Sequence, residues 1–174
     1  MALRFYSYVG DAETAASLDT RRFLVRGAAG VLEWAASAGV SLRAYAELTA
    51  TFIVDDQGDL WIADRQSEHV ACARRRRVYS AGEMTFSIEG QPPGVVVTAV
   101  TNQSTGYCPE PASWPAVAAA LDRAGVDHPD DFTARFLFRR CPACRMRNIV
   151  KDDWYVCGVC GAELPKRWNF VEDA

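Results

Sequence analysis

Two stretches in the middle of the chain alternate hydrophobic and more polar positions, and this alternation predicts two β-hairpins. The first hairpin covers residues 47–54 and, after the turn 55–58, residues 59–64. The second covers residues 83–89 and returns over 95–101 after the glycine- and proline-rich turn 90–94. Because short turns join antiparallel strands, the two hairpins predict an antiparallel sheet.

Helical spacing of apolar residues appears on both sides of this block. Residues 28–37 predict a helix that ends at Gly39. Residues 114–124 predict a second helix, with Ser113 as its N-cap and Gly125 as its stop. We expect two or three helices in total.

Two further strands are expected near the ends of this pattern, at residues 4–9 and 132–139. In the second of them, Phe132, Phe136 and Phe138 should point inward together with Ala134, and Arg139 should point outward. Strands in one block, with helices before and after it, predict an α+β fold rather than a parallel sheet.

Length and composition narrow the class of protein. The chain has 174 residues, 49% hydrophobic and 24% charged, which fits one folded domain with a small appendix. No apolar run approaches the roughly 18 residues that span a bilayer, and the N-terminal residues lack the pattern of a signal peptide. We therefore expect a cytoplasmic protein without a membrane partner, and its oligomeric state stays open.

Two pairs of cysteines predict a metal site. Cys141 and Cys144, and then Cys157 and Cys160, form Cys-x-x-Cys turns separated by the 12 residues 145–156. Such turns let four thiolates surround one tetrahedral ion, and Gly161 supplies the positive φ that the second turn needs. Because protein fills all four positions, we expect structural zinc; iron or a redox-active pair are the alternatives.

The segment from Cys141 to Leu164 resembles a zinc ribbon, with two cysteine turns and a small hairpin between them around Asp152 and Asp153. The resemblance implies an α+β domain over residues 1–139 and a ribbon over 140–174 packed on it. Zinc ribbons bind nucleic acid, bind protein, or stabilise a small fold, so the motif does not choose among these functions.

Arginines gather in two stretches that predict a phosphate-binding patch if they share one face, with Tyr79 or Trp154 available to stack on bases. The candidate residues are Arg74, Arg75, Arg76, Arg77, Arg139, Arg140, Arg145 and Arg147. All but two of the 19 basic residues are arginine, so solvated arginines in a GC-rich genome are the alternative. The net charge of −3 gives no general attraction to nucleic acid, and any binding should be weak.

Cys108 and His69 allow an alternative function, a small hydrolase in which His69 activates the Cys108 thiol and Glu83 or Asn102 orients the imidazole. Buried, inert thiols at Cys72 and Cys108 are the simpler interpretation. A second metal site is also conceivable; its ligands would be His69, Cys72, Cys108 and His128.

Residues 80–109 faintly resemble a module of bacterial toxin and effector proteins, through Ala81-Gly82-Glu83, Asn102-x-Ser104 and Tyr107-x-Pro109. The whole chain is also similar to bacterial proteins without an assigned activity, and neither resemblance implies a mechanism. The sequence thus predicts a zinc-ribbon binding or adaptor protein whose partner is a protein or, less favoured, a nucleic acid.

Overall fold

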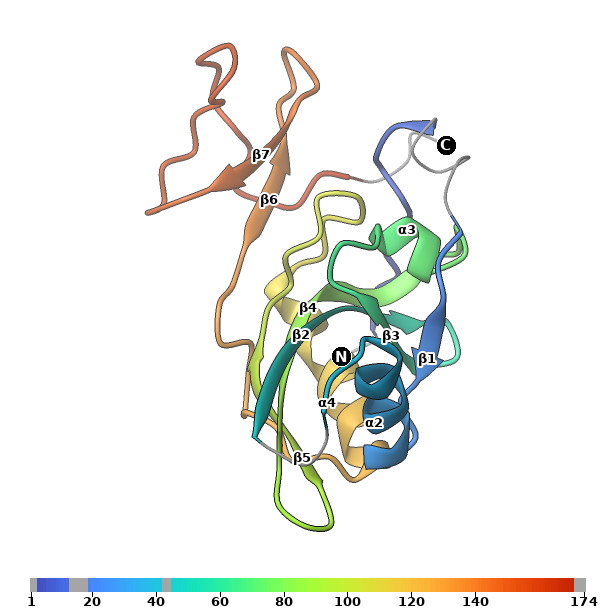
Figure 1. Ribbon diagram of the computed structural model, residues 1–174. Helices are drawn as coiled ribbons and strands as arrows, with labels where there is room; N and C mark the ends of the chain where they lie inside the picture. The colour runs from blue at the N-terminus through green and yellow to red at the C-terminus, as the bar shows by residue number, and fades with distance from the viewer. Residues whose placement is uncertain (1–2, 13–18, 42–44, 171–174) are drawn as a thin grey trace.

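Five antiparallel strands form the main sheet of the computed structural model, which describes residues 3–12, 19–41 and 45–170 (Figure 1). Their order across the sheet is β1-β3-β2-β4-β5. The bounds are Arg22–Leu24 for β1, Ala46–Asp55 for β2, Leu60–Asp64 for β3, Val78–Glu89 for β4 and Gly94–Val100 for β5. The predicted antiparallel sheet is confirmed.

The described residues also form three α-helices and one short 3-10 helix. These are α2 (Ala28–Ser37), α3 (His69–Cys72), η1 (Pro111–Ser113) and α4 (Trp114–Ala124). The α+β class is confirmed, and α2 has the predicted bounds. The four-residue helix α3 was not predicted, because so short an element has no periodic pattern.

Both predicted hairpins are present. Val54 pairs with Leu60 across the β2–β3 turn, and Glu89 pairs with Gly94 across the β4–β5 turn. The long strands β2 and β4 pair from Ala46 opposite Ile88 as far as Asp55 opposite Val78, and this ladder is the centre of the sheet.

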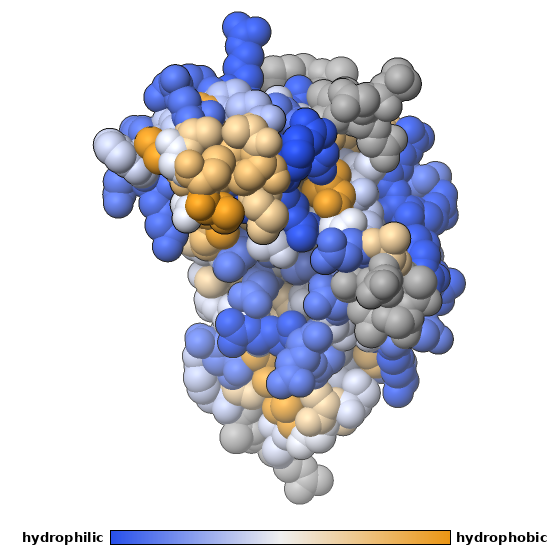
Figure 2. Space-filling model, turned by 90° about the horizontal axis from the view of Figure 1, so that it is seen from above, coloured by the Kyte–Doolittle hydropathy of each residue, from blue (hydrophilic) through white to orange (hydrophobic). Residues whose placement is uncertain are grey.

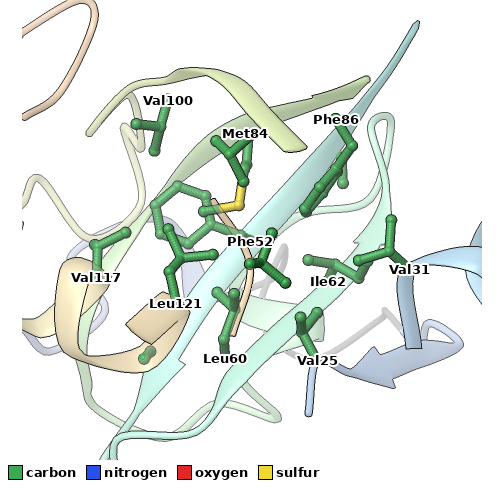
Figure 3. Packing of buried hydrophobic residues seen from close by; sticks show 14 of the residues in the cluster. Val25, Val31, Phe52, Leu60, Ile62, Met84, Phe86, Val100, Val117 and Leu121 are labelled. Carbon is green, nitrogen blue, oxygen red and sulfur yellow. The ribbon is translucent and has the colours of Figure 1, made fainter. Parts of the chain in front are cut away.

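The hydrophobic core lies between one face of the sheet and the helices α2 and α4. Phe52, Met84 and Phe86 point from β2 and β4 toward Val31 of α2 and Leu121 of α4, and all five are fully buried (Figure 3). The alternation of apolar residues in β2 and β4 thus places every second side chain in this core.

A second, smaller cluster covers part of the opposite face. There Ile53 of β2 packs with Val70 and Cys72 of α3, and with Tyr6 and Tyr107 from outside the regular elements. The N-terminal segment and the loop before η1 therefore cover the sheet where α3 does.

Two strand predictions need correction. Residues 4–9 form no strand; Tyr6 makes a single bridge with Val78, and the edge strand is instead the unpredicted β1. Residues 132–136 also lack a ladder, so the predicted strand 132–139 is reduced to β6, Leu137–Arg140. In addition, Ala134 is exposed and Arg139 is buried, the reverse of what the alternation predicted.

Both ends of α4 lie at the predicted residues. Gly125 has φ 62°, the left-handed conformation expected of a helix stop. Ser113 makes no capping hydrogen bond, and its hydroxyl instead lies 2.9 Å from that of Ser80 in β4. Ser113 therefore occupies the predicted N-cap position, but its side chain joins the helix to the sheet instead of capping the helix.

A second sheet of two strands lies at one end of the molecule, where β6 pairs with β7, Arg147–Val150 (Figure 1). We call residues 137–164 the ribbon and residues 165–170 the C-terminal tail. The small hairpin predicted around Asp152 and Asp153 is reduced to the turn and one bridge between Lys151 and Trp154, because β7 pairs with β6 instead. None of the helices in the described part of the chain is long and apolar enough to cross a membrane.

A close backbone approach at Gly82 leads to a first prediction. A Cβ atom at Gly82 would lie 1.9 Å from the carbonyl oxygen of Thr101, so Gly82→Ala should lower the free energy of unfolding by about 3 kcal/mol. Gly94→Ala is the matched control, because its Cβ would lie 3.6 Å from the nearest atom outside its neighbours. Urea unfolding that shows equal stability for the two variants would contradict the prediction.

Candidate metal centre and other predicted sites

The four predicted cysteines meet at one point of the ribbon. Their sulfur atoms all lie within 4.8 Å of one another. The Sγ atoms of Cys141 and Cys160 are 3.6 Å apart, as are those of Cys144 and Cys157. These four residues could hold a metal ion, as their spacing predicted.

The two cysteine turns have the same backbone construction. In the first, Cys141 N donates to Met146 O and Arg145 N donates to Cys141 O, both at 2.9 Å. In the second, Cys157 N donates to Ala162 O at 2.8 Å and Gly161 N donates to Cys157 O at 2.9 Å. Arg145 (φ 64°) and Gly161 (φ 74°) are equivalent positions, and only the glycine was predicted.

Donors from the backbone and from one side chain surround the sulfurs. Cys144 N lies 3.5 Å from Cys141 Sγ, and Val159 N lies 3.4 Å from Cys157 Sγ. Asn148 Nδ2 lies 3.5 Å from Cys157 Sγ, while its Oδ1 accepts a 3.0 Å hydrogen bond from Gly158 N. The sequence did not single out Asn148, because nothing in cysteine spacing marks a residue that orients a ligand.

These donors favour the thiolate form of Cys157 and Cys141. Hydrogen bonds from the Cys160 and Val159 amides lower the pKa of Cys157 to about 6, and the Cys144 amide lowers the pKa of Cys141. Despite the hydrogen bond from the Met146 amide, burial and the neighbouring cysteine sulfurs raise the pKa of Cys144 to about 12. Four soft sulfur donors at this separation suit a tetrahedral ion and leave no ligand position for water. The donor set thus fits a structural metal centre.

The sulfur cluster sits on a small apolar core. Cys141 and Cys157 are buried and pack with Val150 and Leu164, while Cys160 is exposed. One side of an ion at this site would therefore lie near solvent.

Arg139, a predicted nucleic-acid contact, holds the C-terminal tail instead. Its side chain is only 4% exposed, and its guanidinium donates to the carbonyls of Phe138, Pro165 and Lys166 at 2.7–3.2 Å. A guanidinium bound in this way is not available to a phosphate.

The other predicted basic residues differ in their surroundings. Arg76 forms a 2.7 Å ion pair with Asp56, and Arg77 lies 3.9 Å over the ring of Phe5. Arg147 donates to Thr105 O at 2.6 Å, and Arg140 lies over Phe170 at 5.2 Å. Arg74, Arg75 and Arg145 are exposed.

The proposed Cys108–His69 pair does not form. Cys108 is fully buried, and its thiol donates to Thr105 O at 3.3 Å. The Nε2 of His69 lies 2.9 Å from Gly82 O, so it donates to that carbonyl. Glu83 instead forms an ion pair with Arg65 at 3.3 Å. Without an imidazole beside the sulfur, the geometry does not support the hydrolase.

Asn102, the fourth predicted catalytic residue, is part of a buried loop. It is 0% exposed, and Ser104 and Tyr107 are also buried. Tyr107 donates through its hydroxyl to Arg76 O at 2.8 Å, and Cys108 N donates to Ser104 O at 2.7 Å. The polar loop that resembled a toxin module is thus bonded to itself and to its neighbours.

The second metal site is also not formed. Among residues 3–12, 19–41 and 45–170, the four ribbon cysteines are the only group of three or more potential ligands close enough to hold an ion. His128 bonds instead to Pro129 O and Asp122, and Cys72 lies 4.0 Å from Trp61 O.

Comparison with known proteins gives no relative from which a function could be taken. No protein-family model matches the chain, and neither a curated protein nor a solved structure matches it. Function must therefore be inferred from the geometry of this chain.

His69 should make stability depend on pH. Burial lowers the pKa of its imidazole below the usual value near 6.5, despite the hydrogen bond to Gly82 O. The unfolded chain therefore binds a proton at a higher pH than the folded chain does. As the pH falls below about 6.5, the free energy of unfolding should decrease, and above that pH this contribution should be absent.

Urea unfolding between about pH 5 and 7.5 tests this effect. His69→Gln, which keeps a donor for Gly82 O, should show a flatter dependence on pH than the unaltered protein. His128→Gln leaves His69 in place and should keep the slope. An unchanged slope in His69→Gln would show that another group is responsible.

Cys72 and Cys108 should be unreactive in the folded protein. Burial raises the pKa of each thiol to about 12, and thiolates are the reactive form. Iodoacetamide at neutral pH should label them only after unfolding, whereas the exposed Cys160 should be labelled once a chelator has been added. Rapid labelling of Cys108 in the folded protein would restore the hydrolase as a candidate.

Proposed function

We propose that the four cysteines hold one structural zinc ion and that the chain is a binding or adaptor module for a partner protein. The metal part of this proposal rests on the four cysteine sulfur atoms, which all lie within 4.8 Å of one another. The same proposal divides the chain into an α+β domain, residues 1–139, and a zinc-ribbon unit, residues 140–174, which is packed on it and includes most of the ribbon together with the C-terminal tail.

Zinc is favoured over a redox role because four thiolates complete a tetrahedral shell. A redox-active Cys-x-x-Cys works as one pair with a solvent-exposed attacking sulfur. Here the short contacts run between the two turns, Cys141 to Cys160 and Cys144 to Cys157. Such an interleaved arrangement supports one shared ion rather than two separate pairs.

The surface of the ribbon supports a protein partner. Met146, Trp154 and Val159 are 50%, 70% and 65% exposed, although large apolar side chains are usually buried. Figure 2 shows an apolar patch over the end of the ribbon that carries the cysteine turns. Exposed apolar patches of this kind are typical of protein interaction sites.

Nucleic acid and catalysis receive less support. Arg139 is buried and therefore cannot be part of the predicted basic patch. Asp152 and Asp153 add negative charge at the turn of the ribbon. For the enzyme, the described residues bring no imidazole to the Cys108 sulfur. A binding module therefore fits the geometry better than either alternative.

Metal analysis tests the proposal. The purified, reduced protein should contain one zinc ion per chain, and Cys157→Ala should lose it. Because binding energy at such sites is folding energy, hydrogen exchange at the amides of β6 and β7 should accelerate in this variant.

Cys108→Ala is the matched control, since it removes the same thiol from a buried site outside the cluster. It should keep the metal and lower the free energy of unfolding by about 1 kcal/mol. Iron in place of zinc, or full metal content in Cys157→Ala, would refute the assignment.

A further inference from the structure

Four consecutive arginines follow α3, and the first two have an unusual backbone conformation. We call Arg74–Arg77 the arginine loop. Arg74 and Arg75 have φ values of 51° and 61°, in the left-handed region. A residue with a side chain is strained there, and glycine or asparagine is the usual choice at the end of a helix. Such strain is concentrated at functional sites.

Hydrogen bonds hold the loop in this shape. The amides of Arg74 and Arg75 donate to Ala71 O and Val70 O at 3.0 and 2.9 Å. The buried hydroxyl of Tyr107 donates to Arg76 O at 2.8 Å from inside the molecule. The backbone that carries the four guanidinium groups is therefore fixed before any partner binds, which reduces the entropy lost on binding.

Positive charge is crowded at this position. Arg22 packs its guanidinium 3.8 Å over Trp61 and donates to Cys72 O at 2.8 Å, just ahead of the loop. Its Nε is buried and has no hydrogen-bond partner in the described part of the chain. Burial and then the charge of Arg74 lower the pKa of Arg22.

Within residues 3–12, 19–41 and 45–170, this charge is neutralised unevenly. The Arg76 side chain is paired with Asp56, whereas the Arg74 side chain makes no hydrogen bond, ion pair or ring contact there. Like charges kept together on a strained, rigid loop raise the free energy of the folded chain unless an anion binds there.

We propose that the arginine loop, with Arg22 beside it, binds an acidic segment of a partner protein. The proposal rests on the proposed function as a protein-binding module and specifies the chemistry of one contact surface. Guanidinium groups can bind carboxylates through paired N–H donors. Within the chain, Arg76 already binds a carboxylate through one donor, its Nη2, at 2.7 Å from Asp56 Oδ2.

A protein segment fits this surface better than a nucleic acid. Single strands gain much of their affinity by stacking bases on aromatic rings. The rings beside the loop, Phe5 and Trp61, are covered by the guanidinium groups of Arg77 and Arg22. Phe5 also stacks on Tyr79 at 4.2 Å, so these rings are already engaged. The net charge of −3 further opposes a polyanion as long as a nucleic acid.

Fluorescence anisotropy with a labelled oligoglutamate peptide tests the proposal in the full-length, metal-loaded protein. The peptide should bind at low salt and dissociate as salt is added. Arg74→Gly should weaken binding about threefold, and Arg74→Gly combined with Arg75→Gly about tenfold. Both variants should melt at the same or a higher temperature, because glycine relieves the backbone strain.

Arg145→Gly is the matched control, since Arg145 is also exposed and left-handed but lies on the ribbon. It should bind the peptide like the unaltered protein. Absence of peptide binding, or an equal loss in Arg74→Gly and Arg145→Gly, would overturn the proposal. Tighter, equally Arg74-dependent binding of a labelled single-stranded oligonucleotide would also overturn it in favour of a nucleic acid.

Metal content measured on the same samples separates this proposal from the function on which it rests. Zinc-loaded protein that does not bind the peptide would refute only the role of the arginine loop. Peptide binding by protein that never contains zinc would refute only the metal centre.

Discussion

The side-chain amide of Asn102 fixes where the ribbon leaves the α+β domain. Its Nδ2 donates to Pro109 O and Phe136 O, and its Oδ1 accepts from Phe136 N, all at 2.8 Å. The first bond closes the loop after β5, and the other two hold the residue just before β6. Because a buried amide left unpaired costs about 1–3 kcal/mol, the three bonds strongly favour this one path of the chain.

The same amide explains why residues 132–136 form no ladder despite their alternating pattern. Phe136 N donates to the Asn102 side chain at 2.8 Å, and Val100 N donates to the Thr133 hydroxyl at 2.9 Å rather than to a backbone carbonyl of residues 132–136. Side chains have thus replaced part of the backbone ladder, of which the bond from Thr133 N to Val100 O at 2.8 Å and one bridge between Thr101 and Ala134 remain. A pattern of apolar residues predicts which side chains face inward, but it does not predict such a replacement.

Features determined by residues close together in the sequence were mostly predicted correctly, whereas features that depend on distant residues were not. The helix Ala28–Ser37 and both hairpins depend on neighbouring residues, and so does the cysteine cluster, whose turns each close within six residues of the first cysteine. Burial of the Arg139 side chain depends on Pro165 and Lys166, whose carbonyls accept its hydrogen bonds. The alternation of residues 132–139 does not include these partners, so it wrongly predicted that Arg139 points outward. The catalytic prediction failed for a related reason. His69 and Asn102 are residue types that are common in catalytic sites, but here their side chains form hydrogen bonds with backbone atoms.

The C-terminal tail extends the influence of the metal centre beyond the ribbon. Asn169 exchanges two hydrogen bonds with the backbone of Arg140, which directly precedes the first ligand, Cys141. One residue earlier, Trp168 donates to Cys108 O at 2.7 Å and packs edge-on against Tyr6. An ion that fixed Cys141 would therefore also stabilise the strand end that holds Asn169, and through Trp168 the packing of the N-terminal segment on the sheet. Because the apolar core of the ribbon is small, a bound metal would supply stability to contacts that lie outside its own ligands.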